Sequence, residues 1–240
     1  MSVVTSQPEI KVLSFSCVMI WSKIVGVPAL DPTVARGLFD KPATTHIAID
    51  GNGLTIAELH SVQPVKKGDN GFVFTFIPVV KPQVTIGPQR YTNTAPTLAE
   101  VLENHEKLKA LFDKVDPTFV SNLATNQLGI NIECDLNFGD KFSATKWLED
   151  KFGLNKNGFG FKKIIPNQFQ FTIVEEQLNK LTVVIVEPRS NNDHSVFIKI
   201  NDHFGISPIS DYGNSSELKA YFEKSIEKIS NQIIPLLLID

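Results

Sequence analysis

The sequence is poor in the residues that build disulfide, zinc and polybasic sites. Only two cysteines occur among 240 residues, Cys17 and Cys134, with no CxxC pair and no Cys/His cluster beside them. This spacing excludes a disulfide framework and argues against a zinc site. Lysine and arginine number 23 against 26 aspartates and glutamates, so no basic excess points to nucleic acid or to an anionic membrane surface.

The chain also lacks an apolar run long enough to span a bilayer. The apolar stretch at residues 12–21 is interrupted by Ser14 and Ser16 and follows a single basic residue, Lys11. It is typical neither of a transmembrane helix nor of a signal peptide, so we expect a cytoplasmic protein. With 42% hydrophobic and 20% charged residues, the composition is that of an ordinary globular protein of one large or two smaller domains.

Alternating apolar residues predict antiparallel strands. The clearest stretch is 128–138, where Leu, Ile, Ile, Cys, Leu and Phe take the even positions and Gly, Asn, Glu, Asp and Asn the odd ones. One buried and one wetted face of this kind is typical of an antiparallel sheet. Further strands are expected at residues 12–21, 45–49, 54–62, 72–77, 83–92, 168–174, 181–187 and 195–200. Within 83–92, Gly87 and Pro88 indicate an edge strand or a bulge.

Helices are predicted by capping residues followed by apolar residues at three- and four-residue steps. Thr97 and Glu100 form a capping-box pair at the start of a helix over 97–115. A short helix is expected after Ser143, and a long amphipathic helix at 215–233.

Both parts of the chain end in the same order of strand, strand and capped helix. An α+β fold is therefore expected, with antiparallel β-meanders each covered by an amphipathic helix. We expect two similar halves, a meander plus helix at 1–117 and a strand, helix, meander and second helix at 118–240.

Two Asp-His couples are the best candidates for acid–base chemistry or metal ligation. They lie in Asn192-Asp193-His194 and Asn201-Asp202-His203, on either side of the expected strand 195–200. An extended strand would hold the two histidines roughly 30 Å apart, too far for one site. Asn and Asp at strand ends are also ordinary turn residues, and turn chemistry is the favoured interpretation.

Residues 158–163 read Gly-Phe-Gly-Phe-Lys-Lys, which resembles the base-stacking strand of RNA-recognition motifs. On that hypothesis single-stranded nucleic acid would contact four side chains, those of Phe159, Phe161, Lys162 and Lys163. The alternative is the start of a strand, loosened by glycine and carrying two core phenylalanines.

The late apolar run at 233–239 either closes the core or offers a hydrophobic surface to a partner. For the second hypothesis the candidate contacts are Leu236, Leu237, Leu238 and Ile239. His105 falls on the apolar face of the helix at 97–115, where a hydrogen-bonded core histidine is expected. Both cysteines fall in apolar strand positions and are expected to act as small hydrophobes.

The strand that opens the second half contains Leu128-Gly129-Ile130-Asn131. In its overall layout the chain resembles a family of sporadically distributed bacterial proteins of similar length, with two β-rich halves and a terminal amphipathic helix. At this strand that family commonly carries an Arg-Tyr pair near an asparagine, and the pair is missing here. The resemblance implies an accessory role in mobile or defence loci. The meander-plus-helix units are also similar to those of export chaperones of the SecB type, which implies binding of unfolded chains.

The sequence therefore favours a non-enzymatic protein that binds another protein, or a second copy of itself, in a chaperone-like or accessory role. No sequence pattern indicates a catalytic residue, a cofactor, a metal ion or a membrane, and nucleic acid is disfavoured. Two alternatives stay open. One is an enzyme whose site is assembled from distant residues such as Asp193, His194 and His203, and the other is a weak binder of single-stranded nucleic acid.

Overall fold

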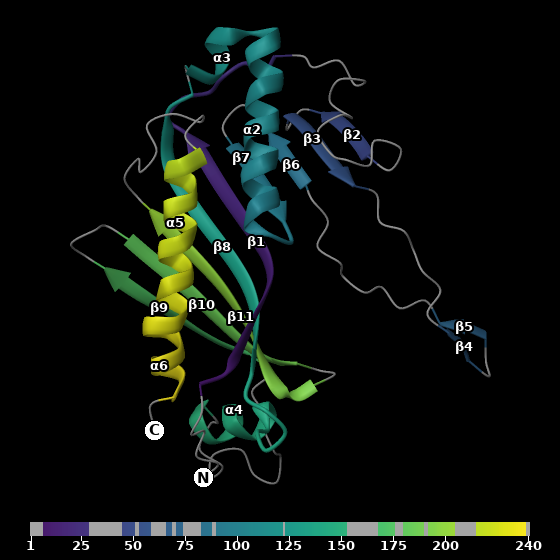
Figure 1. Cartoon of the computed structure of the whole chain (residues 1–240), viewed down its shortest axis with the longest axis vertical. Coiled ribbons are helices and arrows are strands. Elements are labelled where there is room, and N and C mark those ends of the chain that lie inside the picture. The colour runs from purple at the N-terminus through teal and green to yellow at the C-terminus, as the bar shows by residue number, and fades with distance from the viewer. Residues whose placement is uncertain are drawn as a thin grey trace, which may run out of the picture.

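The computed structural model describes residues 7–28, 45–50, 53–58, 66–68, 71–73, 83–87, 90–121, 123–152, 168–175, 180–189, 192–204 and 215–238. In these residues the fold is α+β and is built on one nine-stranded sheet, in which every pair of neighbouring strands is antiparallel (Figure 1). The α+β class with an antiparallel sheet is therefore confirmed.

The strands of the large sheet lie in the order β2-β3-β6-β7-β1-β8-β11-β10-β9. Their bounds are β1 Glu9–Trp21, β2 Thr45–Asp50, β3 Gly53–Glu58, β6 Gln83–Ile86, β7 Arg90–Ala95, β8 Thr125–Asn137, β9 Phe169–Glu175, β10 Lys180–Arg189 and β11 Asn192–Phe204. A separate two-stranded sheet contains β4 (Lys66–Gly68) and β5 (Gly71–Val73). The helices are α2 Leu98–Val115, α3 Pro117–Ser121, α4 Ala144–Phe152, α5 Ser215–Lys228, the π-helical segment η3 Ile229–Ile233 and α6 Ile234–Leu238.

Strands β1 and β8 lie at the centre of the sheet and pair along their whole lengths. On its other side β1 pairs with β7, and β8 pairs with β11. In each case the outer neighbour is the strand that precedes a long helix, α2 after β7 and α5 after β11. Helices α2 and α5 lie over the same face of the sheet (Figure 1).

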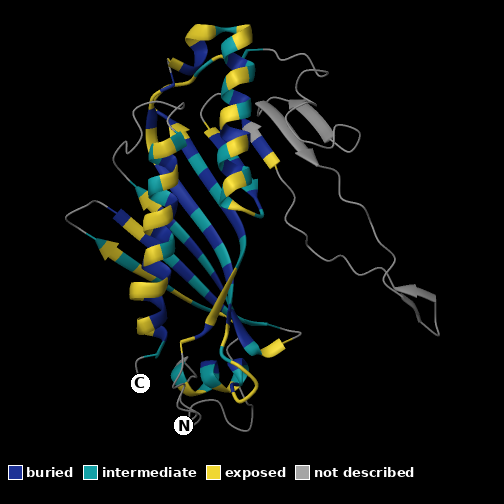
Figure 2. Ribbon diagram, viewed as in Figure 1, coloured by how far each residue is buried: buried dark blue, intermediate teal, exposed yellow. Residues whose placement is uncertain are grey.

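The core lies between these helices and the sheet. In β8 the even residues Leu128, Ile130, Ile132, Cys134 and Leu136 are all buried, as the alternating pattern predicts. Figure 2 shows the same alternation of buried and more exposed residues along the neighbouring strands. Burial of each large aliphatic side chain contributes about 1.5–3 kcal/mol, so the faces of the helices and sheet that meet here hold the fold together.

Local sequence signals fix where helices begin. The capping box of α2 forms as expected, with the Thr97 hydroxyl accepting from the Glu100 amide at 3.2 Å and the Glu100 carboxylate accepting from the Thr97 amide at 3.0 Å. The Ser143 hydroxyl accepts from the Lys146 amide at 3.3 Å at the start of α4. These bonds satisfy amides that have no partner inside a helix.

A proline explains the widened turn near the C-terminal end of the described chain. In a regular α-helix Pro235 could not donate a hydrogen bond, and its ring would collide with the carbonyl one turn earlier. The chain forms a π-helical segment there, in which the Ile234 amide bonds to the Ile229 carbonyl. The wider turn keeps Ile229, Ile233 and Leu237 on the buried side.

Three expected strands differ from the structure. The single strand at 83–92 is wrong, because Gly87 ends β6 and its amide bonds the Arg90 carbonyl at 2.7 Å across the turn to β7. Of 72–77, the described part belongs to β5 outside the large sheet, and 74–77 lie outside the described residues. The strand at 195–200 is too short, because β11 extends from Asn192 to Phe204 and includes both Asp-His couples. Turn chemistry is therefore wrong for Asn201-Asp202-His203. At the other end of β11 the Asn192 side-chain oxygen accepts from the His194 amide at 3.0 Å, a bond typical of turn chemistry.

Candidate functional site

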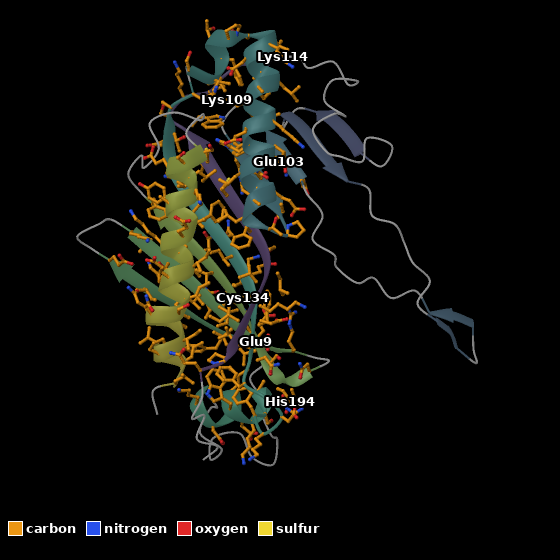
Figure 3. All side chains as sticks on the ribbon, viewed as in Figure 1. Glu9, Glu103, Lys109, Lys114, Cys134 and His194 are labelled. Carbon is orange, nitrogen blue, oxygen red and sulfur yellow. The ribbon has the colours of Figure 1, made fainter. Side chains whose placement is uncertain are left out.

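The first Asp-His couple anchors helix α4 to the sheet. Asp193 accepts hydrogen bonds from the Ser143 hydroxyl at 2.5 Å and from the Thr145 amide at 2.9 Å. Burial opposes its ionisation, but these bonds hold the pKa of Asp193 below its usual value. The His194 ring nitrogen Nδ1 lies 2.9 Å from the Phe142 carbonyl. The couple therefore serves as a distant cap for α4, and Figure 3 shows His194 at that end of the molecule.

The second couple lies at the other end of the same strand and is split between the two faces of the sheet. Asp202 is fully buried, whereas His203 is exposed. Because β11 is continuous from one couple to the other, His194 and His203 are not brought together. Among the described residues no cluster of three or more His, Cys, Asp or Glu side chains could hold a metal ion.

The other candidate residues from the sequence are tail residues, residues outside the described part of the chain, and buried residues. In the tail, Leu237 is buried at 2% exposure and Leu238 packs against the core, whereas Leu236 is 47% exposed. Ile239 and the nucleic-acid candidates Phe159, Phe161, Lys162 and Lys163 lie outside the described residues.

The buried residues His105, Cys17 and Cys134 behave as core residues. Nδ1 of His105 lies 3.3 Å from the hydroxyl of Tyr91, and both residues are fully buried. Burial raises the pKa of both cysteine thiols to about 12, so neither is a ready nucleophile.

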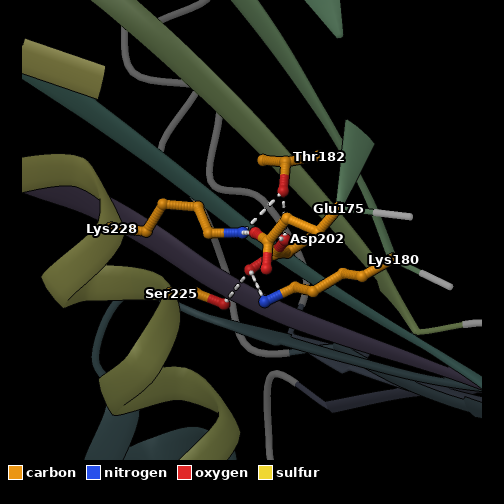
Figure 4. Close-up of polar contacts among 6 residues, drawn as sticks. All are labelled: Glu175, Lys180, Thr182, Asp202, Ser225 and Lys228. Atoms are coloured by element: carbon orange, nitrogen blue, oxygen red, sulfur yellow. Dashed lines mark hydrogen bonds and ion pairs between the residues drawn. The ribbon is translucent and has the colours of Figure 1, made fainter. Parts of the chain in front are cut away.

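A buried charged cluster beneath α5 was not expected from the sequence (Figure 4). Its residues come from β9, β10, β11 and α5, and we call them the α5 cluster: Glu175, Lys180, Thr182, Asp202, Ser225 and Lys228. At its centre, Asp202 accepts from Thr182 at 2.5 Å through Oδ1 and from Ser225 at 2.7 Å through Oδ2.

Two lysines complete the shell around Asp202. Lys228 Nζ lies 3.2 Å from Oδ1 of Asp202, 2.8 Å from Oγ1 of Thr182 and 2.5 Å from Oε1 of Glu175. Lys180 Nζ lies 3.2 Å from the other carboxylate oxygen and 4.3 Å from the centroid of the Phe204 ring. Two positive and two negative groups therefore balance inside the cluster.

The surroundings favour the charged forms of Asp202 and Lys228, whereas burial prevails at Lys180. Burial opposes ionisation of Asp202, yet the two hydroxyl bonds and the lysines hold its pKa below the usual value. Burial lowers the pKa of Lys180. Burial acts in the same direction on Lys228, but its bond to Glu175 and the charge of Asp202 outweigh it and raise the pKa.

The α5 cluster is largely closed to solvent. Asp202 and Ser225 have no exposed surface, and the two lysines retain only 6–7%. Its members bond chiefly to one another, and Glu175, with a side chain 28% exposed, is the most accessible of them. The effect of the cluster is to tie the end of α5 to three strands.

The opposite face of the sheet differs from the core face in having no described helix over it (Figure 1), and we call it the open face. Near its centre the charges pair: Glu133 with Lys199 at 2.9 Å, and Asp135 with Arg189 at 2.6 Å. The Arg189 guanidinium also stacks 4.4 Å from the centroid of the Phe197 ring.

Towards β9 the open face becomes apolar. Val174 on β9 lies directly opposite Leu181 on β10, and these side chains are 57% and 46% exposed. We call these two residues the β9–β10 patch. The exposed His203 borders it, because it lies opposite Leu181 on the other side. The alternation of apolar and polar residues along β9 and β10 predicts which side chains share a face. That these two strands lie side by side near the edge of the sheet depends on the topology.

Comparison with known proteins adds little to these contacts. No family model matches the chain, and no curated protein matches it. Among solved structures the chain is similar to Methanococcus jannaschii TBP, with a TM-score of 0.34 and 11% sequence identity over 93% of this chain and 99% of that one. A likeness this weak carries no argument about fold or function. None of the described helices is both long and apolar enough to cross a membrane.

Proposed function

We propose that the protein is a non-enzymatic binding protein that recognises another protein through the open face of its sheet. The observation that carries this proposal is the β9–β10 patch, where two large aliphatic side chains stand side by side and about half exposed. Paired exposed aliphatic residues on a rigid sheet give a partner apolar area to bury without reorganising the protein.

The charges of the open face favour a protein partner over nucleic acid. Arg189 and Lys199 are each paired with a carboxylate of β8, so neither is free to neutralise a phosphate. The enzyme alternative loses support because Asp193 caps a helix and the histidines of β11 lie at its two ends. The tail leucine Leu236 is retained as a second candidate contact, because it is as exposed as Leu181.

The experiment compares three exposed aliphatic residues in different places. Leu181, Leu236 and Val115 are 46%, 47% and 48% exposed, so each can be changed to serine with a similar small effect on folding. Tagged wild-type and variant proteins are used to capture partners from native lysate, which are read by mass spectrometry and by the ratio of absorbance at 260 and 280 nm. Val115→Ser, at the end of α2, is the matched control.

We expect Leu181→Ser alone to lose a partner that the wild type retains in stoichiometric amount. Loss in Leu236→Ser instead assigns binding to the tail, and equal retention by all three variants contradicts both sites. If nucleic acid co-purifies and its amount falls with added salt, the result would favour weak binding of single-stranded nucleic acid. Many clients in small amounts would indicate a chaperone-like role, and one dedicated partner an accessory role.

Two further expectations belong to this proposal. A relationship by duplication between 1–117 and 118–240 is supported by the strand order, in which β1 and β8 each pair with the strand before a long helix. A cytoplasmic location is supported by two free, buried cysteines, which suit a reducing compartment.

A further inference from the structure

Strand β9 ends the nine-stranded sheet, and among the described residues no strand pairs with its outer edge. It is seven residues long and pairs with β10 over its whole length. One row of its backbone N–H and C=O groups is thus directed away from the sheet. Such a row is a ready template for another strand.

The sequence of β9 does nothing to discourage pairing. It reads Phe-Gln-Phe-Thr-Ile-Val-Glu and contains no lysine, proline or glycine, the residues that protect natural sheet edges. Aromatic and β-branched residues dominate it, which are the residues that favour strands. Its only charged residue, Glu175, is already paired with Lys228.

We propose that β9 pairs antiparallel with β9 of a second copy of this chain, centred on Thr172, and so joins two sheets into one across a two-fold axis. The pairing uses the backbone edge of β9 and not the open face, so it goes beyond the proposed function and does not depend on it.

The arrangement of residues in β9 suits pairing with itself. Centring on Thr172 places Phe171 opposite Ile173 of the second copy, and Phe169 opposite Glu175. Phe169, Phe171 and Ile173 pack on the core side of their own sheet, so the two core faces become continuous. A shift of the pairing by one residue would set core-facing positions against open-face positions. Among the registers that keep the faces matched, the one centred on Thr172, the middle residue of β9, pairs all seven residues of the strand.

The same register keeps like charges apart. The two Glu175 carboxylates would stand at opposite ends of the new strand pair, roughly 20 Å from each other. A two-fold pairing also closes on itself, whereas pairing of β9 with the opposite sheet edge would give open chains. A strand pair of this length is smaller than a standard interface, so we expect a dimer that forms at micromolar or higher concentration.

Cysteine scanning tests the register directly. Thr172 would face itself across the axis with Cβ atoms about 4.5–5.5 Å apart, close to the spacing of a disulfide. We expect Thr172→Cys to form a cross-linked dimer under mild oxidation, seen on a non-reducing gel. Cys17 and Cys134 are fully buried and will not compete.

Gln170→Cys is the matched control, because Gln170 is also exposed on β9 but would face Val174 of the second copy. We expect that variant to stay monomeric, and the double variant Gln170→Cys/Val174→Cys to cross-link. Equal cross-linking of both single variants, or none in Thr172→Cys, overturns the pairing.

Light scattering on the full chain without cysteine changes provides the second test. We expect a mass approaching twice 26.6 kDa at high concentration. Thr172→Lys, which sets two ammonium groups opposite each other on an exposed position, should weaken the dimer about fivefold or more. A monomer at every concentration, or chains longer than a dimer, contradicts the proposal. Retention of the dimer by Leu181→Ser, which changes the open face and not the edge strand, separates this result from the proposed function.

Discussion

The two long helices are fastened to the same face of the sheet by different chemistry. Between α2 and β7 lie four buried residues that we call the α2 cluster: Tyr91 and Asn93 from the strand, and Asn104 and His105 from the helix. None of them is a carboxylate or a lysine. Asn93 donates to the Val101 carbonyl at 2.6 Å, while its own Oδ1 and the Nδ2 of Asn104 have no partner among the described residues. The α5 cluster has four charged groups, each bonded to another member.

The comparison of the two clusters shows that the stability of a buried charged cluster depends on the presence of every one of its members. Moving charges out of water costs several kcal/mol per ion, and the α5 cluster recovers this only while all its partners are present. The α5 cluster therefore adds little net stability. Any other position of α5 on the sheet would leave buried charges without partners and would be unfavourable. The α2 cluster contains no buried charge of this kind, and two of its polar atoms have no hydrogen-bond partner among the described residues. Substitutions in it should therefore lower the free energy of unfolding by less.

The largest effect is expected from removing the centre of the α5 cluster. Asp202→Ala leaves Lys180 and Lys228 buried beside no common carboxylate, and the hydroxyls of Thr182 and Ser225 lose their acceptor. We expect the free energy of unfolding to fall by about 3–5 kcal/mol, measured by urea denaturation. The control is Asp113→Ala, on the exposed side of α2. A loss below about 1 kcal/mol would mean that the charges are solvated and not buried together.

The second expectation concerns acid pH. Because the folded pKa of Asp202 is below the unfolded one, the unfolded chain binds its proton first as pH falls. The stability due to this carboxylate is complete above the unfolded pKa of about 3.9 and is lost as pH falls through the folded value. The effect should be smaller than that of Asp202→Ala, because a protonated carboxyl still fills its site.

Asp202→Asn provides the measurement of this pH effect. Asp193 and Asp116 also have lowered pKa values, so acid destabilisation of the wild type alone does not identify Asp202. The difference in unfolding free energy between wild type and Asp202→Asn should shrink as pH falls below about 4. A difference that stays constant with pH contradicts a buried, ionised Asp202.

Local features of the fold could be predicted from the sequence, whereas the order of the strands could not. The capping box at Thr97 and the alternation in β8 are local signals, and both are confirmed. The single strand expected over 83–92 is wrong because glycine and proline also occur at bulges inside a strand. Only the antiparallel pairing of β6 with β7 shows that the chain reverses after Gly87. Strand order depends on contacts between distant segments, which no local pattern contains.

The α5 cluster was missed for a similar reason. Lys228 and Ser225 read as the polar side of an amphipathic helix, and Asp202 as a turn residue beside His203. Their burial follows from the packing of α5 against β10 and β11, where Ser225 bonds to Asp202 and Lys228 bonds to Thr182. No local sequence pattern contains this packing. A polar residue in the inward register of a strand, as Asp202 is after Ile198 and Ile200, was the one available signal.

A smaller effect is expected in the α2 cluster. Tyr91→Phe removes the hydroxyl near His105 and keeps the ring, whose centroid lies 5.6 Å from that of the imidazole. We expect a loss of about 1 kcal/mol in the free energy of unfolding, the usual contribution of one hydrogen bond. Thermal or urea denaturation measures it. A loss equal to that of Asp202→Ala would erase the distinction between the two clusters.

The smallest effect is expected on the outer surface of α2, away from both clusters. Lys109 pairs with Asp113 one helical turn later at 2.8 Å, and both side chains are nearly 40% exposed (Figure 3 labels Lys109). Water already solvates these charges, so Lys109→Ala should change the free energy of unfolding by no more than about 0.5 kcal/mol. Added salt should reduce even this difference, since exposed charges are screened. If Lys109→Ala instead cost as much as Tyr91→Phe, burial would not be what separates the strong polar contacts of this protein from the weak ones.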